Sequence, residues 1–301
     1  MKRSKLARSR AAAENAKSYA LIAPYMLIFF TFSVLPVLIA IFFSFTRFNM
    51  LQAPQFIGFA NYVRMFGSDD VFYTALKNTL FMAVIVGPGG YLLSLFFAWM
   101  INELSDRLRP FVTFLFYAPS ISGNVYLMWT VLFSGDMYGY INGMLLNLGA
   151  ISEPIQFLKN TKYMMTIVLI VSLWASLGTS FLTFVAGFKG IDRQYYEAGM
   201  IDGISNRWQE LWHITLPIMR PQMLFSAVMS ISGAFGVGAI STALCGFPSN
   251  KYAVHTLMNH LTDYGGLRYE MGYACALATL LFVMMAGFNM LVQRLISKVG
   301  E

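Results

Sequence analysis

The chain has 301 residues, of which 57% are hydrophobic and only 12% are charged, and its formal net charge is +7. Because charged residues make up about a quarter of an ordinary soluble domain, this composition excludes that class and indicates an integral membrane protein. The two cysteines, Cys245 and Cys275, lie far apart without metal-type spacing. We interpret both as small apolar packing residues.

The chain begins with a basic segment, 1–18. Its charged residues are Lys2, Arg3, Lys5, Arg8, Arg10 and Lys17, against the single acid Glu14. This pattern favours a cytosolic tail that is held at the inner leaflet by anionic membrane lipid. We therefore expect lipid rather than nucleic acid as the partner of this tail.

Six apolar runs follow, and each is long enough to cross a bilayer at about 1.5 Å per residue. They cover approximately Tyr19–Phe45, Asn78–Ile101, Phe111–Phe133, Tyr163–Phe188, Gln222–Leu244 and Met271–Val292. The first run is too long for a signal-peptide core and lacks a small-residue cleavage site, so we expect an uncleaved span. Every Asp, Glu, Lys and Arg lies outside the six runs. The predicted fold is all-α and integral to the membrane, with six transmembrane helices.

The second run contains Gly87-Pro88-Gly89-Gly90, which predicts a kink or break in that helix. Two interpretations are left open at this point. The glycines either form a functional hinge or allow a neighbouring helix to pack closely.

Positive charge indicates the orientation of the spans. With the N-terminus inside, 14 of the 21 Lys and Arg residues fall in the tail, in the loop 102–110, between the fourth and fifth runs and at the C-terminus. Because cytosolic loops carry the excess of basic residues, we predict that both termini are cytosolic.

The sequence offers little for catalysis. It contains no G-x-x-x-x-G-K-[ST] loop for ATP, no H-E-x-x-H and no Cys/His cluster for zinc. His255, His260 and Asp263 occur together in the last outer loop, where we expect a solvated loop rather than a metal site. The absence of acids from the six runs argues against an intramembrane enzyme and weakens a proton-coupled carrier, while backbone and hydroxyl sites for sodium stay open. We expect no catalytic residue, no metal and no cofactor in this chain.

Neutral polar side chains lie beside aromatic rings in the third, fourth and fifth runs. Hydroxyls with stacking rings suit a neutral, polyhydroxylated ligand. Ser, Thr and Gly also mediate helix packing in membranes, which is the commoner role for any single residue. The candidate substrate-pathway residues are Tyr126, Trp129, Trp174, Thr179, Ser230, Ser232 and Phe235.

The polar stretch between the fourth and fifth runs, about 189–218, has a layout of its own. Asp192 can cap a helix that carries Glu197, and acid near a helix N-terminus suits the helix dipole. Asp202-Gly203 is a turn or helix-end signal, with Gly supplying the left-handed conformation.

The same stretch continues with a second helical signal. Ser205 can cap a short helix, and Pro217 can occupy the first position of a third. The pattern predicts a compact helix-turn-helix between two spans. A DNA-binding role is excluded because both flanks are membrane-spanning and leave no free recognition helix.

The order of residues in this stretch resembles a family motif. Glu197-Ala198-Gly199, three residues, Gly203, then Ile214-x-Leu216-Pro217 is similar to the EAA loop of ATP-binding-cassette importer permeases. The family pattern has Ala where this chain has Gly199. This small-for-small change lowers helix propensity, and we expect the docking geometry to survive it.

Further motifs along the chain resemble the carbohydrate-importer branch, and in it the first of two permeases, the MalF type of maltose transporters. They are Tyr195-Tyr-Glu-Ala198, Ile201-Asp-Gly-Ile-Ser205, His213-Ile-Thr-Leu-Pro217, Ala23-Pro-Tyr25, Leu35-Pro36, Phe59-Ala-Asn-Tyr62, Lys77-Asn-Thr-Leu80 and Met271-Gly-Tyr-Ala274.

The resemblance implies a type I importer permease fold, with a transmembrane domain over 19–301, a core over 70–295 and a cytosolic EAA coupling loop at about 189–218. It also implies partners: a second homologous permease, two ATPase subunits that bind ATP and Mg, and an extracytoplasmic solute-binding protein that delivers a sugar. The EAA helix is then the coupling helix that docks on an ATPase in the cytoplasmic (inner) membrane of a prokaryote. The residues that carry the coupling are Glu197, Ala198, Gly199, Asp202 and Gly203.

Two other functions remain as alternatives. An ion-coupled secondary sugar carrier would transport by itself, without ATP. An importer permease of the same class could instead carry a non-sugar neutral solute. Strongly charged cargo is disfavoured, because spans without charged residues would not compensate ionic groups.

Overall fold

The computed structural model describes residues 19–122 and 126–296, and these are nearly all helical. The predicted basic tail, 1–18, lies outside the described residues. The N-terminal half contains η1 (Phe30–Val34), α2 (Leu35–Phe43), β1 (Thr46–Arg47), β2 (Gln55–Phe56), α3 (Ala60–Gly67), α4 (Asp70–Asn102), α5 (Leu108–Ile121), α6 (Tyr126–Leu132) and α7 (Tyr140–Asn147). The two short strands pair antiparallel, with Thr46 opposite Phe56.

The C-terminal half continues in the same way. It contains α8 (Thr161–Ala175), α9 (Thr179–Lys189), α10 (Arg193–Ile201), α11 (Arg207–Glu210), η2 (Leu211–Thr215), α12 (Leu216–Ile218), α13 (Arg220–Phe235), α14 (Gly238–Cys245), η3 (Asn250–Tyr252), α15 (Leu257–Thr262), η4 (Asp263–Leu267) and α16 (Met271–Ile296).

Within the described residues, four helical stretches are long and apolar enough to cross a membrane by themselves. They are Tyr19–Phe43, Asp70–Asn102, Thr161–Lys189 and Met271–Ile296. Two bent pairs raise the number to six: Leu108–Ile121 with Tyr126–Leu132, inclined by 90°, and Arg207–Ile218 with Arg220–Phe235, inclined by 82°. The predicted all-α fold is confirmed, with four candidate spans, or six if each bent pair forms one span.

The fifth span differs from the prediction. The expected helix Gln222–Leu244 ends at Phe235, and α14 is a separate helix. Gly233, Gly236 and Gly238 crowd this point, and the amide of Gly236 donates to the carbonyl oxygen of Gly233 over 3.0 Å, which closes the last turn of α13. Because glycine has low helix propensity, three of them in six residues are enough to end the helix here.

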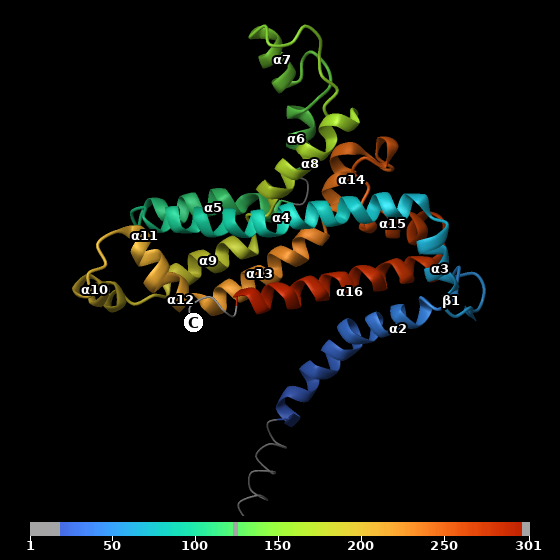
Figure 1. Cartoon of the computed structure of the whole chain (residues 1–301), viewed down its shortest axis with the longest axis horizontal. Helices are drawn as coiled ribbons and strands as arrows, with labels where there is room; N and C mark the ends of the chain where they lie inside the picture. Colours follow the sequence, from blue (N-terminus) through green and yellow to red (C-terminus); the bar gives the residue numbers. More distant parts are fainter. Residues whose placement is uncertain (1–18, 123–125, 297–301) are drawn as a thin grey trace, which may run out of the picture.

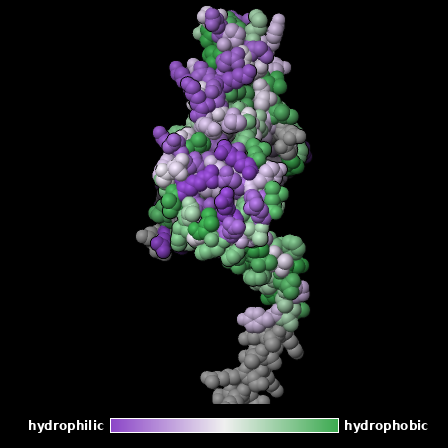
Figure 2. Space-filling model, turned by 90° about the vertical axis from the view of Figure 1, so that its right-hand side faces the viewer, coloured by the Kyte–Doolittle hydropathy of each residue, from purple (hydrophilic) through white to green (hydrophobic). Residues whose placement is uncertain are grey.

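The long helices form a bundle in which α4, α5, α9, α13 and α16 run side by side (Figure 1), and α13 packs against α4, α9 and α16. Helices α10, α11 and α12 lie at one end of this bundle, while α3, β1 and α15 lie at the other. Helices α6 and α8 extend away from the bundle, and α7 lies at the tip of this projecting segment. Helix α2 lies on the outside of the bundle, where it packs against α16. The end with α3, β1 and α15 presents a largely hydrophilic surface (Figure 2).

The apolar core consists of three clusters, and α4 contributes to each of them. Phe72 belongs to the cluster near α15 and α16, Met82 to the cluster with α8 and α13, and Ile101 to the cluster with α9 and the 189–218 loop. All three side chains are at most 3% exposed. Helix α4 is therefore the element that joins the clusters along the bundle.

Of the kink or break expected at Gly87–Gly90, the break does not occur, because α4 continues through Pro88 as one helix. A Cβ on Gly90 would lie 2.5 Å from Ser176 Oγ, and a Cβ on Gly89 would lie 2.9 Å from Leu173 Cδ2. Glycine occurs here because α8 and the residues after it approach α4 closely. Of the two interpretations left open by the sequence, close helix packing applies.

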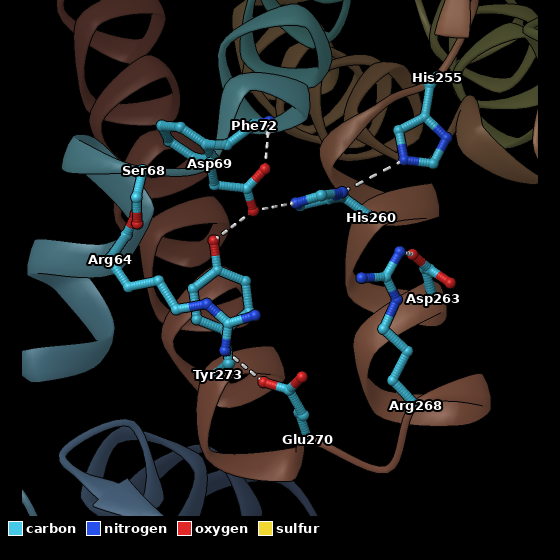
Figure 3. Close-up of polar contacts among 10 residues, drawn as sticks. All are labelled: Arg64, Ser68, Asp69, Phe72, His255, His260, Asp263, Arg268, Glu270 and Tyr273. Atoms are coloured by element: carbon cyan, nitrogen blue, oxygen red, sulfur yellow. Dashed lines mark hydrogen bonds and ion pairs between the residues drawn. The ribbon is translucent and has the colours of Figure 1, made fainter.

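A buried polar cluster holds the N-terminal end of α4 (Figure 3). The carboxylate of Asp69 caps the helix by accepting from the amide of Phe72 over 3.0 Å. The hydroxyl of Tyr273 donates to Asp69 Oδ2 over 2.6 Å, and His260 Nε2 lies 2.8 Å from the same oxygen. His255 Nε2 is 3.4 Å from His260 Nδ1. The cluster thus ties α4 to α15 and α16.

This cluster corrects the expectation of a solvated loop at His255 and His260, since each side chain is only 2% exposed. The loop is buried because Asn78 of α4 donates to the carbonyl oxygens of Tyr252 and His255, at 3.1 and 2.9 Å. Asp263 instead pairs with Arg268 over 2.6 Å. Among the described residues, no group of three or more His, Cys, Asp or Glu side chains could hold a metal ion.

Burial changes the acid–base properties of two members of the cluster. Burial, and to a smaller extent the neighbouring His260, lowers the pKa of His255 to about 4, so this imidazole is neutral at neutral pH. Burial alone would raise the pKa of Asp69, but the hydrogen bonds from Tyr273 and His260 outweigh it and keep that pKa below its usual value. The cluster therefore favours the ionised carboxylate of Asp69, which accepts hydrogen bonds from Phe72, His260 and Tyr273.

Candidate functional site

The first candidate site is the loop 189–218, which folds into α10 and, after a turn, into the consecutive short helical segments α11, η2 and α12. Asp192 caps α10 as predicted, with its carboxylate accepting from the amide of Gln194 over 3.1 Å. Gly203 ends the first helical unit with φ of +93°, a conformation that L side chains rarely adopt. The predicted turn at Asp202-Gly203 is confirmed.

The second helix of the loop begins one residue later than predicted. Asn206, not Ser205, is the N-cap of α11, and its side-chain oxygen accepts from the amide of Gln209 over 2.8 Å. Ser205 instead donates its own amide to Gln209 Oε1 over 2.9 Å. Pro217 lies in the short α12, and the spanning helix α13 starts only at Arg220, beyond the 82° bend. The predicted place of Pro217 at the start of a third helix is confirmed, but this helix, α12, is only three residues long.

The predicted coupling residues divide into two groups. Glu197, Ala198, Asp202 and Gly203 are exposed on the surface of the loop. Gly199 is buried, and a Cβ there would lie 2.5 Å from Ile214 Cδ1. Gly199 therefore makes room for a side chain of its own chain, Ile214.

A charged groove of about 860 Å³ lies between this loop and the adjoining ends of α4, α5 and α9. Glu197 lines it together with Glu103, Arg207 and Glu210. Arg207 Nη1 pairs with Glu210 Oε2 at 2.7 Å, and Arg207 Nη2 lies 3.4 Å from Glu103 Oε2. The groove is thus lined by both acidic and basic side chains. The loop that forms one side of it has a backbone held by helix caps and a turn.

The second candidate site is a cavity of about 420 Å³ within the bundle. Its lining comes from the places where three spans are interrupted. Pro119 and Ser122 end α5, Gly178 lies between α8 and α9, and Gly236 lies between α13 and α14. At membrane depth, irregular backbone is tolerated where it lines a cavity, because its polar groups need partners other than lipid.

One serine side chain bonds interrupted backbone, and another links two of the lining helices, α9 and α13. Ser120 Oγ donates to the carbonyl oxygen of Leu177 over 3.1 Å, and Ser180 Oγ donates to that of Ser226 over 3.1 Å. Ser180 Oγ also lies 3.0 Å from Ser230 Oγ. The buried Ser172 Oγ has no hydrogen-bond partner among the described residues. The cavity therefore presents hydroxyls, and none of the described residues that line it carries a charge.

The structure places only part of the predicted substrate pathway at this cavity. Tyr126, Thr179 and Ser230 line it. Trp129 and Trp174 do not, and their rings contact each other edge to face with centroids 5.2 Å apart. Trp129 packs against the buried apolar cluster that contains Met82, and Trp174 contacts the Trp129 ring.

Two further predicted residues also lie away from the cavity lining. Ser232 Oγ donates to the carbonyl oxygen of Val228 in its own helix over 2.9 Å. Phe235 is 3% exposed and packs its ring against Phe288 at 5.6 Å. Sequence reasoning did not assign Pro119, Gly178 and Gly236, although Pro and Gly inside an apolar run were the available signal.

Comparisons with known proteins place these sites in context. A family model described as "Binding-protein-dependent transport system inner membrane component" matches residues 90–299, which include the loop and, apart from Val86, the described lining of the cavity. The chain belongs to this family, so it is a membrane component of a binding-protein-dependent transport system. The resemblance seen in the EAA loop is confirmed at this level.

Individual relatives agree with the family. The chain is 34% identical to a probable ABC transporter permease protein, YesP, of Bacillus subtilis over 90% of its own length and 87% of the relative. It is 27% identical to the arabinooligosaccharides transport system permease protein AraP of the same organism, over 90% of this chain and 85% of the relative. A solved bacterial ABC transporter involved in the import of the acidic polysaccharide alginate contains a chain of the same fold, with a TM-score of 0.77 and 23% identity. The match covers 97% of this chain and 99% of that chain.

Proposed function

We propose that this chain translocates a neutral sugar or oligosaccharide across the cytoplasmic membrane of a prokaryote, driven by separate ATPase subunits that dock on the loop 189–218. The observation that carries this proposal is the loop itself. It exposes Glu197, Ala198 and Asp202 on a two-helix unit whose ends are fixed by the Asp192 cap and the Gly203 turn. ATP and Mg are bound by the ATPase partners rather than by this chain.

A sugar as cargo is supported by the cavity and by the relatives. The cavity offers uncharged hydroxyls, which can exchange hydrogen bonds with a saccharide as it passes. Relatives include permeases named for arabinooligosaccharides and for lactose. The related structure named for alginate belongs to a carrier of an acidic polysaccharide. The absence of charge from the cavity lining favours neutral cargo for this chain.

The other partners follow from the same proposal. A second permease of similar fold completes the membrane unit, and an extracytoplasmic solute-binding protein delivers the sugar. A related solved transporter is described in complex with a pentasaccharide-bound periplasmic protein. We place both termini and the loop in the cytosol, and the hydrophilic end with α3, β1 and α15 outside, in line with the distribution of basic residues.

The test is a charge reversal on the loop. We expect Glu197→Lys to abolish ATP-driven uptake and to reduce co-purification of the ATPase, because the exposed carboxylate faces the partner. Glu153→Lys, an exposed acid between α7 and α8, is the matched control and should transport normally. Normal uptake by Glu197→Lys would overturn the docking assignment. Uptake by the purified chain alone without ATP would indicate an ion-coupled carrier instead.

A further inference from the structure

The end of α4 and the loop 189–218 are joined by a contact that the loop's docking role does not require. The rings of Trp99 and Trp208 lie with centroids 4.7 Å apart. Glu103 and Arg207 pair at 3.4 Å beside them. Trp99 and Glu103 are four residues apart, so they lie on one face of α4, and Arg207 and Trp208 are consecutive on α11. We refer to these four residues as the clasp.

Apolar packing continues the clasp into the interior. Ala98 and Ile101 of α4 share one buried cluster with Leu211 and Leu216, which follow α11 in the loop. All four are at most 8% exposed. The second half of the loop is therefore packed onto α4 and not only connected through the chain to α13.

The end of α4 is itself held in place. Arg109 of α5 donates through Nη2 to the carbonyl oxygens of Asn102 and Leu104, at 2.8 and 2.9 Å. These carbonyls lie at the helix end, where no intrahelical donor is available. A movement of the clasp would therefore act on a helix terminus that is already capped and ordered.

The helices that the loop joins through the chain are interrupted, whereas α4 is not. Helix α9 is separated from α8 by 176–178, and α13 is separated from α14 by 236–237, both at the cavity. Helix α4 runs through 33 residues without a break, about 50 Å at 1.5 Å per residue. Its far end is the Asp69 cap in the buried polar cluster. The clasp is thus the contact by which the loop reaches an unbroken helix.

We propose that the clasp is a positioning contact that passes movement of the loop to α4, and that α4 carries this movement as a rigid helix to the polar cluster at Asp69. This inference rests on the proposed docking of an ATPase on the loop. The exposed Glu103–Arg207 pair contributes little by itself, since surface ion pairs are weak. The tryptophan pair supplies the packing, and the ion pair sets which face of α4 is engaged.

The experiment uses the assembled importer in lipid nanodiscs, with a fluorophore on Thr74→Cys, an exposed position at the outer end of α4. Cys245 and Cys275 are replaced by Ser. We expect Trp208→Ala to co-purify the ATPase as before, to lose most of the ATP-dependent signal at position 74 and to reduce uptake at least tenfold. Trp99→Ala should have the same effect from the α4 side, and the double variant should be no worse than either single one.

Trp212→Ala is the matched control, because Trp212 is as exposed as Trp208, at 67% against 66%, and lies on the same loop outside the clasp. It should leave the signal at position 74 unchanged. Equal losses for Trp208→Ala and Trp212→Ala, additive losses for Trp99→Ala and Trp208→Ala, or an unchanged signal in Trp208→Ala would each overturn the clasp. Failure of the unmodified chain to co-purify the ATPase would instead refute the proposed docking.

Discussion

Two kinds of spanning helix lie side by side in this molecule. Helix α4 contains Gly-Pro-Gly-Gly in its middle and still runs unbroken, while the span formed by α8 and α9 is interrupted at 176–178 with one glycine, Gly178. The difference lies in what the backbone meets. The glycines of α4 receive side chains from α8 and from Ser176 while the helix continues, whereas at 176–178 the backbone lines a cavity and the carbonyl oxygen of Leu177 accepts from the Ser120 hydroxyl. Glycine content alone therefore does not determine where a span breaks.

The comparison can first be tested at the Asp69 end of α4, through the pH dependence of stability. His255 has a folded pKa of about 4 against an ordinary value of 6.5, because burial disfavours its charged form. The contribution of neutral His255 to the free energy of unfolding is fully present above about pH 6.5. It is lost as pH falls toward 4, because only the unfolded chain gains the proton in that interval. The loss amounts to about 3 kcal/mol.

We expect the thermal midpoint in detergent to fall between pH 7.5 and pH 4.5 for the unmodified chain, and to fall much less for His255→Gln. Asp69, whose pKa is lowered, contributes stability that is lost only as the pH falls further, below its ordinary value of about 4. Equal pH dependence of the two proteins would contradict a buried, neutral His255.

A second test concerns the packing that keeps α4 continuous. Gly90→Ala places a Cβ 2.5 Å from Ser176 Oγ, so the neighbouring chain must shift, and we expect a loss of about 2 kcal/mol. Gly287→Ala on α16 is the control, because nothing lies within 4 Å of its Cβ. Helix propensity alone should make that variant slightly more stable. If the thermal midpoints of Gly90→Ala and Gly287→Ala change by the same amount, the packing at position 90 is not tight.

The third test addresses the broken spans. Ser230→Val removes a hydroxyl that lines the cavity, while Ser232→Val removes one that bonds within its own helix. We expect uptake to fall about tenfold for the first, which corresponds to about 1.4 kcal/mol and to the loss of one hydrogen bond. The second should transport nearly normally. The reverse order of effects, measured with radiolabelled sugar, would place the pathway elsewhere.

The smallest effect is expected at the end of the bundle that carries the loop 189–218. Asn206→Ala removes the N-cap of α11 and should cost about 1 kcal/mol, while Ser205→Ala should have little effect. Amide hydrogen exchange of Gln209, whose N–H bonds the cap, reports this directly. Faster exchange in Ser205→Ala than in Asn206→Ala would reverse the cap assignment.

Much of this arrangement could be predicted from the sequence. Long apolar runs and the EAA-like order around Glu197 led to the fold class, the family and the position of the loop. The Asp192 cap and the Gly203 turn also followed, because capping and left-handed backbone depend on local residues.

Tertiary contacts could not be predicted in the same way. The burial of His255 and His260 depends on Asn78, more than 170 positions earlier in the chain, and no local pattern reports it. Trp129 and Trp174 share the composition of a sugar site, but they pack against each other instead of lining the cavity. The cavity itself arises where interruptions of three spans meet, which a single run does not reveal.

The interrupted spans also bear on how the chain enters the bilayer. Helices α5 and α6 have 14 and 7 residues, whereas about 20 apolar residues are needed for a helix to cross by itself. Helix α4 precedes them in the chain and exceeds that length with 33 residues. We therefore expect α4 to insert autonomously during synthesis and to serve as the template on which the shorter segments settle, so that the cavity forms only after its lining has assembled around an inserted helix.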